Sequence, residues 1–266
     1  MIKRVTPAFL ILIILFSSPG LAFEETTRSA MIQNQINQYR QQAAESLQSY
    51  KQASGERKIQ ALKNYGIRAI ELRLRWIEKL QDRIQNLNID EDMRQILITD
   101  LNNNASGISA LKGKIEAEID LETLKNDVRA IFVDYRIFLV VLPRNHGRLA
   151  AARLGLISQI IVQHEEKIDE LVASLKAAGA DTNPLESLVS EFKTQVDQAE
   201  SNIQAADDQF VQMTPTDTEA AKTQLQTGRE FLHQAVTNFQ SAKETLGKIK
   251  IEVKNLRDWL KNSGQE

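Results

Sequence analysis

The chain has 266 residues, no cysteine and a formal net charge of −2. The absence of cysteine excludes disulfides, thiol catalysis and cysteine-ligated zinc or iron–sulfur centres. The near-neutral charge argues against a nucleic-acid-binding protein, which usually carries a clear basic excess.

The first 22 residues have the pattern of a secretory signal peptide. Two basic residues precede nine apolar residues at 8–16, and the small residues Gly20 and Ala22 fit a cleavage site after Ala22. An uncleaved anchor is the alternative, but residues 5–23 include two serines, two prolines and a glycine, a poor composition for a spanning helix. We expect an exported protein, periplasmic or at the cell surface of a bacterium, with no membrane span after cleavage.

From residue 23 onward, composition and apolar spacing both indicate helix. Residues 23–142 contain no proline and are rich in straight-chain residues that helices favour. Four apolar seams with alternating steps of three and four run over residues 121–142, 154–178, 185–213 and 232–260, whereas a strand would need a period of two. The sequence therefore predicts an all-α fold: an elongated antiparallel helical bundle or coiled coil of about six to eight helices, without a sheet.

Local signals predict where the first helices begin and end. Ser54-Gly55 separates a first helix, at about 26–53, from a second at about 56–87. Acidic residues at 90–92 mark the start of the third helix, where the helix dipole favours negative charge. The run NNNASG at residues 102–107 is either a loop or a weak kink.

Further along, Gly179 is expected to end a helix and Asn183-Pro184 to begin the next one, with Asn183 as the N-cap. Residues 214–217 repeat this pattern before a last helix at about 217–262. We expect a signal peptide (1–22), N-terminal helical hairpins (23–119) and a C-terminal heptad-rich bundle (120–266). The last two form either separate domains or one continuous domain.

The segment 135–154 combines a solid apolar run with a basic turn. Pro143 and Gly147 are expected to break or kink the helix, with the next one starting near Arg148. Amides at a helix start and nearby cations form a generic anion site, and the alternative is a buried hairpin whose turn is solubilised by charge. The candidate contact residues are Arg144, His146, Arg148 and Arg153.

No other motif supports catalysis. The run from His164 to Ile168 begins like the helix of a zinc protease, but Ile168 occupies the position of the second histidine. Ser109 and Lys112 have the spacing of penicillin-recognising enzymes without that family's companion motifs. We therefore expect no enzyme activity, no cofactor and no metal.

Residues 120–215 resemble an uncharacterised family of exported, heptad-rich helical proteins that is frequent in candidate phyla and other bacteria. The resemblance lies in the apolar run ending in Leu142-Pro143, the alanine-rich helix start at 149–154 and the turn Gly179-Ala180-Asp181 before a paired helix. It implies an exported helical fold, and it implies no known catalytic residue.

These observations favour a non-enzymatic cell-envelope protein that acts as scaffold, spacer or adhesion module, with an envelope protein or a surface polymer as partner. One alternative is a periplasmic holdase with exposed apolar surface, for which Trp76 and Trp259 are candidates. Another is an anion or small-ligand binder that uses the turn from Arg144 to Arg153. The wide apolar faces of the helices favour a monomer over a two-stranded coil.

Overall fold

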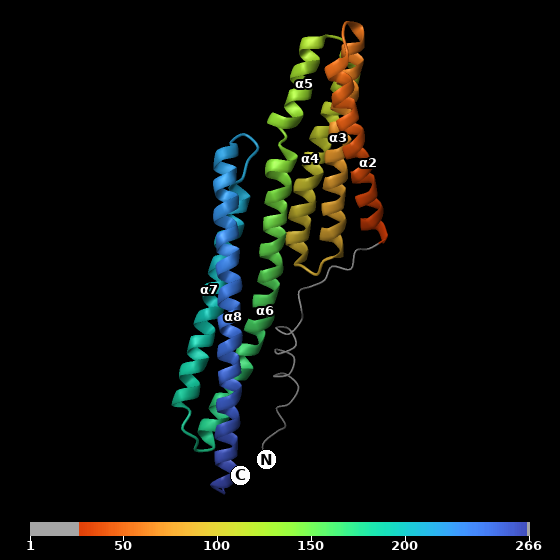
Figure 1. Cartoon of the computed structure of the whole chain (residues 1–266). Coiled ribbons are helices and arrows are strands. Elements are labelled where there is room, and N and C mark those ends of the chain that lie inside the picture. The colour runs from red at the N-terminus through yellow and green to blue at the C-terminus, as the bar shows by residue number, and fades with distance from the viewer. Residues whose placement is uncertain (1–26, 265–266) are drawn as a thin grey trace. The chain divides into compact units, whose positions relative to one another are not determined.

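A computed structural model describes residues 27–264 of the chain, with side chains described from residue 31 onward (Figure 1). Within this range the fold consists of seven α-helices and one π-helical segment, and it contains no strand. The predicted all-α bundle without a sheet is confirmed. The predicted signal peptide, residues 1–22, lies outside the described residues. None of the described helices combines the length and the apolar composition that crossing a bilayer requires.

The described chain divides into two compact units, each assembled from segments that are distant in the sequence. The N-terminal unit contains residues 27–152 and 207–228, and the C-terminal unit contains residues 153–206 and 229–264. Residues 120–152 thus pack with the N-terminal helices, although the sequence pattern grouped them with the C-terminal bundle. Seam periodicity shows that a helix packs, but it does not show which neighbour it packs against.

The N-terminal unit is built from short-looped helices that lie side by side in Figure 1. They are α2 (Thr27–Gln52), α3 (Glu56–Asn86), α4 (Glu91–Ala117), α5 (Leu121–Val133), the π-helix η1 (Ile137–Val141) and the start of α6 (Leu142–Ala177). Helix α3 is central and packs against α2, α4 and α5. Its fully buried Ile70, Ile77 and Ile84 recur every seven residues, which keeps one face of the helix in the core.

Helix α4 begins at the predicted acidic residues, and its structure decides between the two interpretations of residues 102–107. Asp90 caps the helix by accepting hydrogen bonds from the backbone N–H groups of Asp92 and Met93 at 3.0 and 3.2 Å. The helix then continues without interruption through residues 102–107. Gly107 is needed there for packing, because an added Cβ would lie 2.9 Å from the ring of Tyr135.

The helix break in the segment 121–154 lies earlier than predicted. Helix α5 ends at Val133, Arg136 adopts a left-handed conformation with φ of 40°, and η1 leads directly into α6 at Leu142. Pro143 therefore lies in the first turn of α6, directly after η1. The expected helix start near Arg148 is wrong, because α6 continues without a break through Pro143 and Gly147.

In the C-terminal unit, parts of α6, α7 (Asn183–Gln212) and α8 (Thr218–Asn262) pack through the predicted seams. Fully buried seam residues include Phe192, Val196, Ala199, Ala235, Ala242 and Ile249. Gly179 ends α6 as predicted and has a φ of 89°.

The starts of α7 and α8 differ slightly from the predictions. Helix α7 begins at Asn183 itself, and the buried Thr182 takes the capping position: its carbonyl accepts the Glu186 N–H at 2.8 Å. Helix α8 begins at Thr218, where the Asp217 carboxylate accepts the Ala220 N–H at 3.0 Å. The Asp217 side chain thus satisfies a free N–H group of the first turn, whereas the Thr182 carbonyl accepts the first hydrogen bond within α7.

Candidate functional site

The predicted basic turn lies at the start of α6, and two of its arginines are bound to carboxylates of the N-terminal unit. Arg144 donates through Nη2 to both carboxylate oxygens of Asp100 at 2.7 Å, and through Nη1 to the Met213 carbonyl at 2.8 Å. Arg148 donates through Nε to Asp207 at 2.9 Å. Both arginine side chains are largely buried. The two guanidinium groups therefore join α6 to α4, to the end of α7 and to the residue that follows it.

Asn145 extends this network into the core. Its side chain is fully buried and donates to Asp100 Oδ2 at 2.6 Å and to the Val141 carbonyl at 2.9 Å. Its own Oδ1 is buried without a hydrogen-bond partner. Asp100 thus accepts from two neighbouring side chains of α6, which fixes the start of that helix against α4.

The other two predicted contact residues lie elsewhere. His146 reaches the surface, and partial burial of its ring, together with the positive charge of Arg83, lowers its pKa. Arg153 belongs to the C-terminal unit. The structure therefore brings together Arg144 and Arg148 with acidic partners, and the anion site remains a prediction.

A second site, which the sequence analysis missed, surrounds Arg73 on α3. The side chain is only 7% exposed, and its guanidinium carbon lies 4.6 Å from the ring centroid of Phe132 and 4.8 Å from that of Phe138. The two phenylalanines flank the helix break, one on α5 and one on η1. The cation is thus held between two aromatic rings, an arrangement that attracts it to their negative faces.

Further aromatic side chains complete the site. Tyr65 stacks on Phe132 with ring centroids 6.1 Å apart, and Trp76 meets Phe138 edge-on at 6.4 Å. Next to Phe138 in the chain, Leu139 is 65% exposed, and both phenylalanine residues are more than a third exposed. We call Tyr65, Arg73, Trp76, Phe132, Phe138 and Leu139 the aromatic–arginine surface.

The charge of Arg73 is not balanced within this surface. Its Nη1 donates to the Ala69 carbonyl at 2.8 Å, while its buried Nε has no acceptor. Among the side chains described, no carboxylate forms an ion pair with it. Burial lowers the pKa of Arg73 to about 10, so the group is still a cation at neutral pH. Ring contacts of about 0.5–2 kcal/mol each offset only part of a desolvation penalty of several kcal/mol.

The backbone beside this surface is also unusual. Arg136 is the only non-glycine residue with positive φ in the described part of the chain, and η1 is the only π-helical segment there. Both features cost conformational energy and occur often at functional sites. The site was not predictable from the sequence, because the uninterrupted 3–4 spacing of residues 121–142 placed Phe138 on a buried seam.

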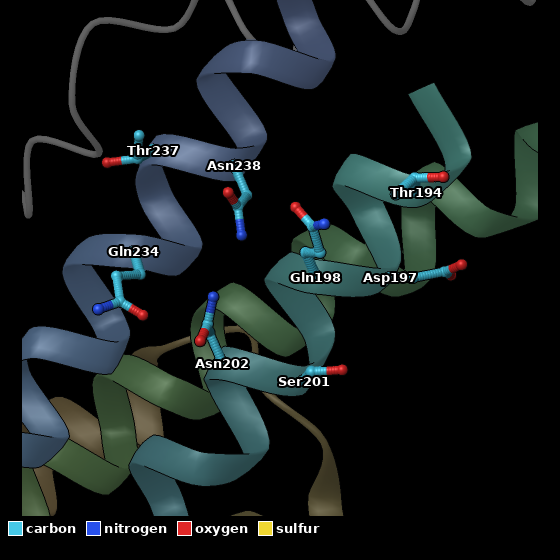
Figure 2. A pocket seen from close by; sticks show the side chains of 8 residues that line it. All are labelled: Thr194, Asp197, Gln198, Ser201, Asn202, Gln234, Thr237 and Asn238. Atoms are coloured by element: carbon cyan, nitrogen blue, oxygen red, sulfur yellow. The ribbon is translucent and has the colours of Figure 1, made fainter. Parts of the chain in front are cut away.

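The C-terminal unit contains an open polar groove of about 500 Å³ between α7 and α8. Figure 2 shows Gln198 and Asn202 on α7 facing Gln234 and Asn238 on α8. The remaining lining residues are Thr194, Asp197, Ser201 and Thr237. The groove offers amide and hydroxyl groups for hydrogen bonding, and Asp197 is the charged residue in its lining.

Comparison of the chain with protein-family models, with curated proteins and with solved structures finds no match in any of the three.

Proposed function

We propose that this protein is a non-enzymatic, exported helical-bundle protein of the cell envelope that acts as a scaffold, spacer or adhesion module. In this proposal the aromatic–arginine surface is where it docks to its partner. The observation that carries the proposal is the position of Arg73, a buried cation between two partly exposed phenylalanine rings and without a carboxylate partner among the described side chains.

The composition of the surface supports docking rather than simple solvation. Residues that dominate binding energy in protein interfaces are enriched in tryptophan, tyrosine and arginine, and they cluster with apolar neighbours that exclude water. Tyr65, Arg73 and Trp76 lie on one helix, and the exposed Leu139 follows Phe138, which contacts Trp76. The part of the proposal that concerns export to the cell envelope rests on the signal-peptide pattern of residues 1–22.

The experiment is lysine cross-linking in intact producing cells, followed by mass spectrometry of the proteins attached to this chain. The variant Leu139→Asp places a charge on the aromatic–arginine surface, and Ile96→Asp is the matched control, since Ile96 is a similarly apolar residue, 47% exposed, on α4. We expect one dominant envelope partner with the wild-type chain, at least tenfold less of it with Leu139→Asp, and no change with Ile96→Asp. Equal capture by all three chains would refute docking at this surface.

A holdase is the second candidate, and exposed apolar residues on α8 favour it. Trp259 is 49% exposed and Ile251 is 63% exposed, whereas Trp76 is packed against the core of the N-terminal unit. A holdase would cross-link to many unrelated exported proteins and would bind a hydrophobic dye in its folded state. An anion-binding function through Arg144 and Arg148 is less well supported, because Asp100 and Asp207 already occupy both guanidinium groups.

A further inference from the structure

We propose that the occupant of the aromatic–arginine surface is a protein segment that presents a carboxylate between apolar side chains, and that this carboxylate pairs with Arg73. The inference rests on the proposed function, because it names the chemistry of the partner at the same surface.

The first argument is charge. Arg73 is more than nine-tenths buried, its Nε has no acceptor, and no described carboxylate pairs with it. Two other largely buried arginines of the N-terminal unit follow a different pattern: Arg144 is paired with Asp100 and Arg148 with Asp207. An incoming carboxylate would give Arg73 the counterion that the chain provides for the other two.

The second argument is the apolar surroundings. The rings of Phe132 and Phe138 lie on the guanidinium group, both residues are partly exposed, and Leu139 extends the apolar area outward. A carboxylate that reaches Arg73 must therefore bring apolar neighbours that cover these side chains and exclude water. A highly charged polymer does not fit, since it would favour a cluster of cations, and the groups in contact with Arg73 are aromatic rings.

A peptide selection tests the inference even while the natural partner is unidentified. A phage-displayed library of random peptides, long enough to form a helix-in-groove or strand segment, is selected on the full folded chain and counter-selected on Leu139→Asp. The best peptide is then synthesised together with a version in which its acidic residue is replaced by the amide. Both are titrated against wild-type protein and against Arg73→Met, with Ile96→Asp as control.

We expect the selected peptides to contain Asp or Glu flanked by apolar residues. The amide version should bind wild-type protein at least tenfold more weakly, and Arg73→Met should bind both versions equally weakly, because the two changes remove the same ion pair. If Arg73→Met does not fold, as circular dichroism would show, Arg73→Lys takes its place and should retain only part of the preference for the acidic peptide.

The other outcomes separate the two proposals. Peptides that bind at this surface without an acidic residue would overturn the inference about the carboxylate and leave the docking surface intact. Peptides whose binding ignores Leu139→Asp would overturn both. If sedimentation shows that the wild-type chain self-associates and that Leu139→Asp abolishes the association, the occupant is a second copy of this chain, and the inference is wrong.

Discussion

Arg144 on α6 donates to both carboxylate oxygens of Asp100 on α4, 44 positions earlier in the chain, at 2.7 Å. The same carboxylate accepts the side-chain amide of Asn145, and Arg144 also binds the Met213 carbonyl after α7. Asp100 is therefore the single acceptor that two neighbouring side chains of α6 share. Three parts of the N-terminal unit that are far apart in sequence meet at this point.

Replacing Asp100 with alanine should destabilise the protein, because Arg144 and Asn145 lose the carboxylate that they share and keep only the backbone carbonyls of Met213 and Val141 as acceptors. Fully buried pairs lose about 3–5 kcal/mol in this way. Since Asp100 keeps some contact with solvent, we expect a loss of roughly 2 kcal/mol, below that range because of screening. Urea unfolding measures it.

The control for this prediction is Glu122→Ala. Glu122 pairs with Lys125 on the surface of α5, and both side chains are well exposed. Exposed pairs contribute about 0–1 kcal/mol, so Glu122→Ala should change the unfolding free energy little. An equally small effect of Asp100→Ala would mean that the buried network does not hold α6 against α4.

A second prediction concerns Phe210, which packs closely against two glycines of the N-terminal unit. A Cβ added to Gly228 would lie 2.5 Å from the Phe210 ring, and one added to Gly147 would lie 2.6 Å from it. Alanine is normally about 1 kcal/mol better than glycine inside a helix. At Gly228 we expect the opposite, a loss of roughly 1–3 kcal/mol, because the fully buried ring must move.

Gly113→Ala is the matched control in the same unit. It lies inside α4, and nothing approaches its added Cβ within 4 Å. Thermal unfolding should show Gly113→Ala to be more stable than wild type and Gly228→Ala to be less stable. If both variants gain stability, the close packing of Phe210 on α8 is incorrect.

The sequence was sufficient to predict the helices but not the arrangement of their breaks. Four seams, the acidic helix start at 90–92 and the stop at Gly179 depend on spacing and local residue type, which a sequence displays directly. Pro143 and Gly147 were misinterpreted because the same residue types serve as breakers and as first-turn or close-packing residues. Only the tertiary neighbour of Gly147, the Phe210 ring, distinguishes the two roles.

The candidate sites were less predictable than the helices, because they too depend on neighbours that are distant in the sequence. The basic turn was visible as a charge pattern, but its partners Asp100 and Asp207 are distant in sequence. Arg73 was one of many cations on an amphipathic helix. Its position between Phe132 and Phe138 depends on the break at Arg136, for which the sequence carries no glycine or proline signal.

This break gives a third prediction. Arg136 adopts φ of 40°, a conformation that costs an L-residue about 1–2 kcal/mol and costs glycine almost nothing. Arg136→Gly should therefore be more stable than Arg136→Ala by roughly 1 kcal/mol, although glycine is the weaker helix former. Chemical denaturation of the two variants measures the difference. A more stable alanine variant would indicate that α5 and η1 form a continuous helix.

The last prediction concerns pH and Glu165 on α6. One carboxylate oxygen of Glu165 is buried without a hydrogen-bond partner. Burial raises its pKa; Lys193 opposes this, and Asp197, Asp169 and Glu200 add to it. Because the pKa of Glu165 is higher in the folded than in the unfolded protein, the protonated form of Glu165 favours the folded state. This contribution to stability is complete below the unfolded pKa and is lost as the pH rises through the folded pKa.

Glu165→Gln should therefore stabilise the protein at pH 7, and the gain should disappear towards pH 4. Glu166→Gln is the matched control, since Glu166 is the exposed neighbour on the same helix, and surface changes of this kind usually stay within about 0.5 kcal/mol. Urea unfolding of the three chains at both pH values measures the effect. A gain from Glu165→Gln that persists at pH 4 would show that it does not arise from the charge, because the wild-type carboxyl is then largely protonated.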